Sequence, residues 1–97
     1  MVLEAKIAKE AVELSLRKRS GLSHIKVRTR GDIVTLESVD EEGIKYPHAR
    51  FKRRTVHIWC LQMPTKRNWE PTFIEGTLSQ LVDVLVDKFP WALRPVQ

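Results

Sequence analysis

The side chains with the clearest chemical potential in this chain of 97 residues are cations gathered in its middle. Thirteen lysines and arginines lie between Arg17 and Arg67 against five acids, so this stretch has a net charge of +8 in a chain whose total is +5. Cations at alternate strand positions neutralise phosphates, and aromatic rings among them can stack on bases. The sequence therefore indicates a basic surface that favours a polyanion as its partner.

Groups for catalysis or metal binding are sparse by comparison. Cys60 is the single cysteine, and the three histidines, at positions 24, 48 and 57, do not follow a metal-ligand spacing. No nucleophile–base pair is recognisable, and the four glycines form no phosphate-binding loop. We therefore expect a protein that is not an enzyme, with no catalytic residue, no metal site and no cofactor.

Length and composition predict one cytoplasmic domain. Ninety-seven residues suit a single domain, 1–97, and the apolar runs are too short to span a bilayer. The first residues carry acids and no signal-peptide core. A lone cysteine fits a reducing cytosol. We therefore expect a cytoplasmic location and no membrane as partner.

The segment 24–39 predicts a β-hairpin, because two alternating runs flank Gly31-Asp32. A two-residue turn places Val27 opposite Leu36, and both strands then agree on which side is apolar. The opposite side of the hairpin carries Lys26, Arg28 and Arg30.

A second hairpin is expected from the segments 44–52 and 55–63, the latter being apolar on both parities and therefore central in a sheet. In the predicted register Phe51 faces Val56 across a four-residue loop, which places Cys60 on the inner, apolar face. The outer face then carries His48, Arg50, Lys52, His57 and Trp59, with Arg53 and Arg54 in the adjoining loop.

Two amphipathic helices frame these strands. The first is predicted over 3–19, with Gly21 as its cap, and the second begins at Thr77 with the capping-box spacing Thr77-x-x-Gln80 and ends at Pro90. The predicted core consists of Leu3, Ile7, Leu14, Val27, Leu36, Phe51, Val56, Ile58, Leu81, Leu85 and Phe89.

This order predicts an α+β fold, α-β-β-β(-β)-α. We expect an antiparallel sheet of three to five strands, the last a short one at residues 73–74 after a loop at 65–72. Because the sheet has one clearly apolar face, both helices should pack on that face. The other face is left open, and the cations lie on it.

Two resemblances accompany this order. The layout is similar to the double-stranded-RNA-binding domain, although this chain has residues 75–80, EGTLSQ, where that family carries lysines at the start of its second helix. Residues 49–51 (ARF) and 59–61 (WCL), followed by Trp69 and Phe89, resemble a family of short bacterial domains of unknown function. That resemblance implies a bacterial α+β module without assigned chemistry.

Two functions remain open. The first is a small non-enzymatic protein that binds nucleic acid or another polyanion, such as an acidic protein, through the basic face. The alternative is a protein-interaction module or homodimeric adaptor, because Trp59, Trp69 and Trp91 are many for so small a core, and tryptophan and arginine are enriched at interface hot spots. The cations could also be no more than the solvated side of an antiparallel sheet. The residues predicted to bind the partner are Lys26, Arg28, Arg30, Arg50, Lys52, Arg53, Arg54, His57 and Trp59.

Overall fold

The computed structural model describes residues 2–19, 22 and 24–93, with residues 2–5 described by their backbone alone. Within this part of the chain, two helices and a five-stranded antiparallel sheet confirm the predicted α+β fold. The elements are α1 (Val2–Arg17), β1 (Lys26–Arg30), β2 (Ile33–Val39), β3 (Lys45–Arg53), β4 (Trp59–Pro64), β5 (Trp69–Gly76), α2 (Leu78–Lys88) and the 3-10 helix η1 (Pro90–Leu93).

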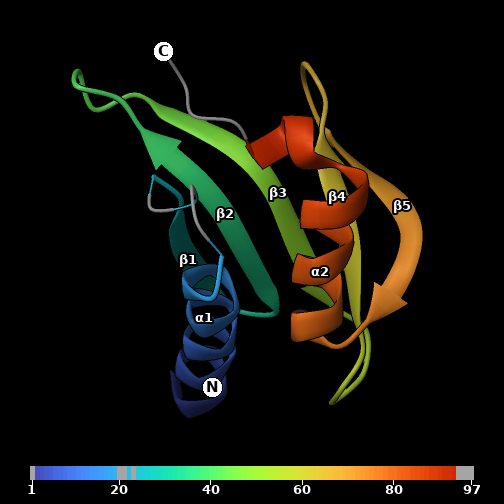
Figure 1. Ribbon diagram of the computed structural model, residues 1–97. Coiled ribbons are helices and arrows are strands. Elements are labelled where there is room, and N and C mark those ends of the chain that lie inside the picture. Colours follow the sequence, from blue (N-terminus) through green and yellow to red (C-terminus); the bar gives the residue numbers. More distant parts are fainter. Residues whose placement is uncertain (1, 20–21, 23, 94–97) are drawn as a thin grey trace.

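The sheet has one covered face and one open face. Its strands follow one another in sequence order, and Figure 1 shows α1 and α2 next to each other on the same side of the sheet. Helix α1 packs on β1, and α2 packs on β4 and β5. We call the side that the helices cover the inner face and the opposite side the outer face.

The first hairpin has the predicted register. Val27 pairs with Leu36, and both are buried. The turn depends on Gly31, whose φ of 58° is easily adopted by a residue without a Cβ atom. The local turn chemistry therefore sets which side of β1 and β2 faces the helices.

The second hairpin differs from the prediction. Phe51 pairs with Leu61, not with Val56, and the connection between the strands is residues 54–58. Its first two N–H groups donate to the Ile58 carbonyl at 2.8 and 3.1 Å. Because the pairing moves by an odd number of positions, each side chain of β4 lies on the face opposite to the predicted one.

Strand β5 replaces the predicted loop and short last strand. After a turn in which Thr65 Oγ1 donates to the Asn68 carbonyl at 2.9 Å, the strand begins at Trp69. The register of β4 and β5 shifts between Cys60 and Gln62. Strand β5 therefore has extra residues opposite β4 at this point, and they form a bulge at the edge of the sheet.

The core is formed by both hairpins and by the two helices. On α1 the buried residues include Val12 and Leu16, while the predicted core residues Ile7 and Leu14 are 58% and 56% exposed, so these two predictions are wrong. Val56 is 67% exposed because it lies in the β3–β4 connection. The predicted Leu3 side chain lies outside the described residues. The core predictions that the structure confirms are Val27, Leu36, Phe51, Leu81 and Leu85, while Ile58 and Phe89 are half-buried.

Helix α2 begins with the predicted capping box. Thr77 Oγ1 accepts from the Gln80 N–H at 3.2 Å, and Gln80 Oε1 accepts from the Thr77 N–H at 2.9 Å. The helix ends at Lys88, before Pro90. The predicted cap Gly21 of the first helix lies outside the described residues. Neither helix, over its described length, is apolar and long enough to cross a membrane.

Candidate functional site

Cations from β1 and β3 lie together on the outer face. Arg28 pairs with Thr35 on β2, and Thr35 pairs in turn with Arg50 on β3, so the cation rows of the two strands project from the same side. Neighbouring strands are about 5 Å apart, so these two rows are separated by roughly 10 Å. We use the term basic sheet face for Lys26, Arg28, Arg30, Arg50 and Lys52.

Most of this charge is uncompensated. Arg28 forms an ion pair at 3.0 Å with Glu37, a carboxylate that is buried beneath the outer face. Lys26, Arg30 and Lys52 are exposed and form no ion pair with any residue that the structure describes. Between β1 and β3, the outer face therefore carries three solvated cations and one acid, Glu37, whose charge Arg28 already neutralises.

Arg50 links the basic sheet face to an aromatic ring on β5. Its Nε donates to Gln62 Oε1 at 2.6 Å, and its guanidinium carbon lies 4.5 Å from the centre of the Trp69 ring. Partial burial lowers the pKa of Arg50 from its usual value, although an arginine remains charged at physiological pH. The contact holds the half-buried Trp69 as the aromatic partner of the basic sheet face.

Phe73 is a second ring on this strand. Pro71 and Glu75 pair with outer-face residues of β4, and Phe73 lies midway between them in the bulge of this edge strand. Its side chain is 88% exposed, and its φ is 63°, in the left-handed region that bulky residues rarely adopt. Sequence reasoning missed Phe73 and named Trp69 only as a candidate for a protein interface, not for the basic face. The alternation Trp69-x-Pro71-x-Phe73 was the available signal, but the proline and its neighbours suggested a loop.

Four of the predicted site residues lie elsewhere. Trp59 is on the inner face and 8% exposed, because the β3–β4 connection reverses the alternation of β4. Arg53 pairs with Trp59 and shares that side, with its guanidinium carbon 5.9 Å from the ring centre. His57 is exposed in the connection. Arg54 lies 3.4 Å from the Glu75 carboxylate.

His48 and Cys60 also lie on faces opposite to the predicted ones. The register of β2 and β3 shifts between Leu36 and Glu37, which leaves His48 as an extra residue on β3. A bulge redirects the side chain of its extra residue, and His48 is buried. Cys60 follows the reversed alternation of β4 and is buried on the outer face, paired with Lys52.

His48 belongs to a polar cluster that ties η1 to the sheet. Its Nε2 lies 2.5 Å from Ser38 Oγ, and its Nδ1 lies 2.6 Å from the Ala92 carbonyl oxygen. His24 Nε2 lies 2.7 Å from the Leu93 carbonyl oxygen, and the two imidazole rings meet edge to face at 5.7 Å. Burial lowers the pKa of His48, with a smaller contribution from His24, and the hydrogen bond to Ala92 opposes them. Although a serine beside a histidine is also a nucleophile–base pair, Ser38 is itself only 5% exposed.

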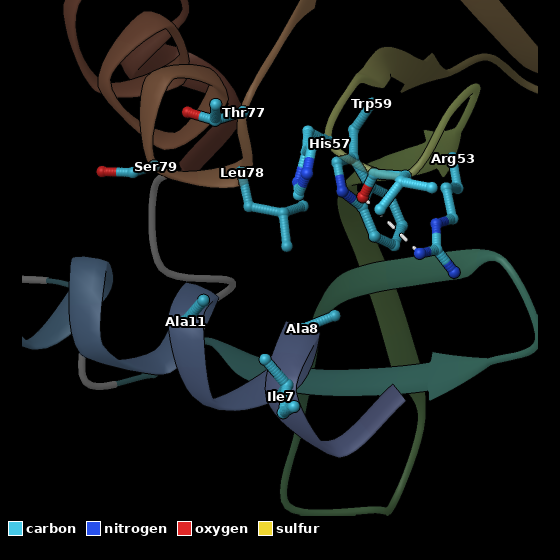
Figure 2. A pocket seen from close by; sticks show the side chains of 10 residues that line it. Ile7, Ala8, Ala11, Arg53, His57, Trp59, Thr77, Leu78 and Ser79 are labelled. Atoms are coloured by element: carbon cyan, nitrogen blue, oxygen red, sulfur yellow. Dashed lines mark hydrogen bonds between the residues drawn. The ribbon is translucent and has the colours of Figure 1, made fainter. Parts of the chain in front are cut away.

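A cavity of about 500 Å³ opens between α1, the β3–β4 connection and the first turn of α2. Figure 2 shows Leu78 reaching from the start of α2 toward this gap, with Ala8 and Ala11 on the α1 side. The lining includes one cation, Arg53, and one histidine, His57. Arg53 also donates to the Thr55 carbonyl at 3.3 Å. The cavity is lined by Ile7, Ala8, Ala11, Arg53, Val56, His57, Trp59, Thr77, Leu78 and Ser79.

Across the described ranges, no three His, Cys, Asp or Glu side chains gather in a group that could hold a metal ion. Comparisons with models of protein families, with curated proteins and with solved structures found no match. The two resemblances noted in the sequence therefore stay predictions.

Proposed function

We propose that this protein binds nucleic acid or another polyanion through the basic sheet face and that it is not an enzyme. The observation that carries the proposal is the gathering of five cations on the side of the sheet that the helices leave open. These side chains would neutralise phosphates and release the cations condensed on the polyanion, and that release favours binding. Lys26, Arg30 and Lys52, which are exposed and form no ion pair with a described residue, are the first contacts expected.

We expect binding to depend on the phosphate backbone of the nucleic acid more than on its base sequence. Both helices lie on the face opposite to the cations, so a nucleic acid on the basic sheet face would not receive a helix in its major groove. Side chains that contact phosphates fix the position of a nucleic acid but carry little sequence information. A single buried cysteine suits a reducing compartment, so the proposal includes a cytoplasmic location.

Titration of labelled oligonucleotides at two salt concentrations tests the proposal. Fluorescence anisotropy should detect binding at low salt and a steep loss of affinity toward moderate salt. If three or four of the five cations contact phosphates, the log–log slope should be roughly −3 to −4 for a duplex and roughly −2 to −3 for a single strand. The proposal is wrong if single strands, duplexes and polyphosphate all bind more weakly than about 10⁻⁴ M at low salt, which is the weak end of ordinary non-specific binding.

A homodimeric interaction module is the second candidate function. It is favoured by the exposed apolar residues Ile7 and Leu14 on α1 and Val56 beside the cavity, because a two-fold dimer needs only one patch that matches itself. Sedimentation should then detect a dimer that persists at high salt and is lost in Ile7→Glu. A monomer at tens of micromolar would contradict this candidate.

A further inference from the structure

We propose that the basic sheet face takes single-stranded rather than duplex nucleic acid and that Trp69 and Phe73 stack on its bases. This inference rests on the function proposed above and specifies its ligand. It is carried by the cations on β1 and β3, by the Arg50–Trp69 contact on the same face, and by the exposed ring of Phe73 in the bulge of β5.

Phe73 is the residue that the fold alone does not explain. A ring that is 88% exposed gains almost nothing from burial, and its φ of 63° is unfavourable for a bulky residue. A glycine at this position would avoid the strained conformation and leave no apolar surface in water. Such outliers gather where a ligand is bound, so the ring is most simply explained as a contact for one.

The strained backbone of Phe73 is held in place by its two neighbours in sequence, Thr72 and Ile74. Thr72 Oγ1 donates to the Leu61 carbonyl at 3.0 Å and accepts from the Ile74 N–H at 3.2 Å. Ile74 itself packs against the core. The ring of Phe73 is therefore carried on a fixed bulge, which lowers the entropy lost when a base stacks on it.

Trp69 supplies a second platform four residues earlier on the same strand. Arg50 lies against its ring at 4.5 Å, and the indole is only half-buried. Planar guanidinium groups and aromatic rings are both surfaces on which unpaired bases stack. A single strand could thus lay its phosphates toward β1 and β3 and its bases toward β5.

A duplex cannot use the rings in this way, because its bases are already stacked inside the helix. Its phosphates still meet the cations. The proposal therefore separates two properties: all polyanions share the salt-dependent attraction, and single strands gain an additional contribution from β5. An exposed ring could instead dock a protein, but the neighbouring cations favour a polyanion as the occupant.

The test compares three ligands and two variants by anisotropy or competition at constant salt. The ligands are a labelled single-stranded oligonucleotide, the duplex of the same sequence and inorganic polyphosphate. The first variant is Phe73→Gly, which deletes the ring and relieves the strain. The matched control is Trp91→Ala, which removes a 59% exposed ring on η1, on the helix side of the sheet.

Phe73→Gly should weaken single-strand binding by about 5- to 150-fold, the loss expected for one stacked base. Its affinity for the duplex and for polyphosphate should change less than twofold, and Trp91→Ala should bind all three ligands normally. In a Trp91→Phe background, tryptophan emission comes from the exposed side of Trp69 and from the buried Trp59. The single strand should quench part of this emission, and polyphosphate should not. Equal binding of single strand and duplex, or unchanged single-strand binding by Phe73→Gly, would overturn the inference while the basic sheet face stands. If none of the three ligands binds, the proposed function fails with it.

Discussion

The guanidinium carbon of Arg50 lies 4.5 Å from the centre of the Trp69 ring and thereby joins β3 to β5 across β4. Gln62 lies on the intervening strand and accepts from Arg50 Nε at 2.6 Å. One side chain thus makes a polar contact with its neighbouring strand and a cation–π contact with the next. This places the outermost strand in a fixed relation to the basic sheet face.

Replacing Arg50 by lysine should lower the free energy of unfolding by about 1 kcal/mol. Lysine keeps the charge but loses the planar group over Trp69 and the Nε donor to Gln62. Urea unfolding monitored by circular dichroism measures the change. The same substitution at the solvated Arg30 should cost less than about 0.5 kcal/mol, and an equal loss at both positions would argue against the contact.

Removing the three solvated cations together should flatten the salt dependence of oligonucleotide binding. Each lost phosphate contact reduces the log–log slope by roughly 0.9, so Lys26→Ala/Arg30→Ala/Lys52→Ala should lower its magnitude by about 2 to 3. The control is Lys6→Ala/Lys9→Ala/Lys88→Ala, which removes the same charge from exposed positions on α1 and α2. If both variants behave alike, net charge and not the outer face determines binding.

Phe73→Gly should stabilise the fold by about 1 kcal/mol, although it is expected to weaken ligand binding. The native φ of 63° is unfavourable for phenylalanine and easy for glycine. Thermal and urea unfolding measure the change. Glycine at the exposed Glu70 of the same strand should instead destabilise by about 0.5–1 kcal/mol, as usual within a strand. A destabilised Phe73→Gly would mean that the ring contributes to folding after all.

Stability should decrease on acidification because of His48. Its pKa in the folded protein is lowered by burial, so between the unfolded value of about 6.5 and the lower folded value the unfolded chain binds the proton more readily. The stabilising contribution is therefore complete above about pH 6.5 and is lost as the pH falls toward the folded pKa. Unfolding free energies at pH 7.5 and 5.5 measure this difference. His48→Gln should reduce it, and His57→Gln, at an exposed position, should leave it as in the unmodified protein.

The first hairpin was predictable from sequence, and the second was not, for a physical reason. Gly31-Asp32 permits a two-residue turn, and that turn fixes the register locally. Around the second turn, Val56 and Ile58 have one parity and Trp59 the other, so the apolar pattern favours neither register. The decision comes from hydrogen bonds within the connection, such as Thr55 Oγ1 accepting from the Ile58 N–H at 3.2 Å.

The cations of the site were predictable because β1 and β3 keep the predicted alternation where those residues lie. The aromatic side was not, since it depends on β5, whose Pro71 and bulge conceal a strand pattern. The buried face of α1 was hard to predict for a similar reason. Its apolar residues spread over two neighbouring stripes, and the sequence does not say which stripe the rest of the protein covers. Packing against β1 and α2 selects the stripe with Val12 and Leu16.

The two border strands of the sheet have a consequence for self-association in the test tube and in the cell. Strand β1 carries three cations along its five residues, and β5 contains Pro71, which has no N–H, and the left-handed residue Phe73. Charges, prolines and bulges at a sheet border obstruct edge-to-edge growth into fibres. We therefore expect the protein to stay dispersed at high concentration. Many copies bound along one long polyanion should also remain separate, because their sheets do not pair edge to edge.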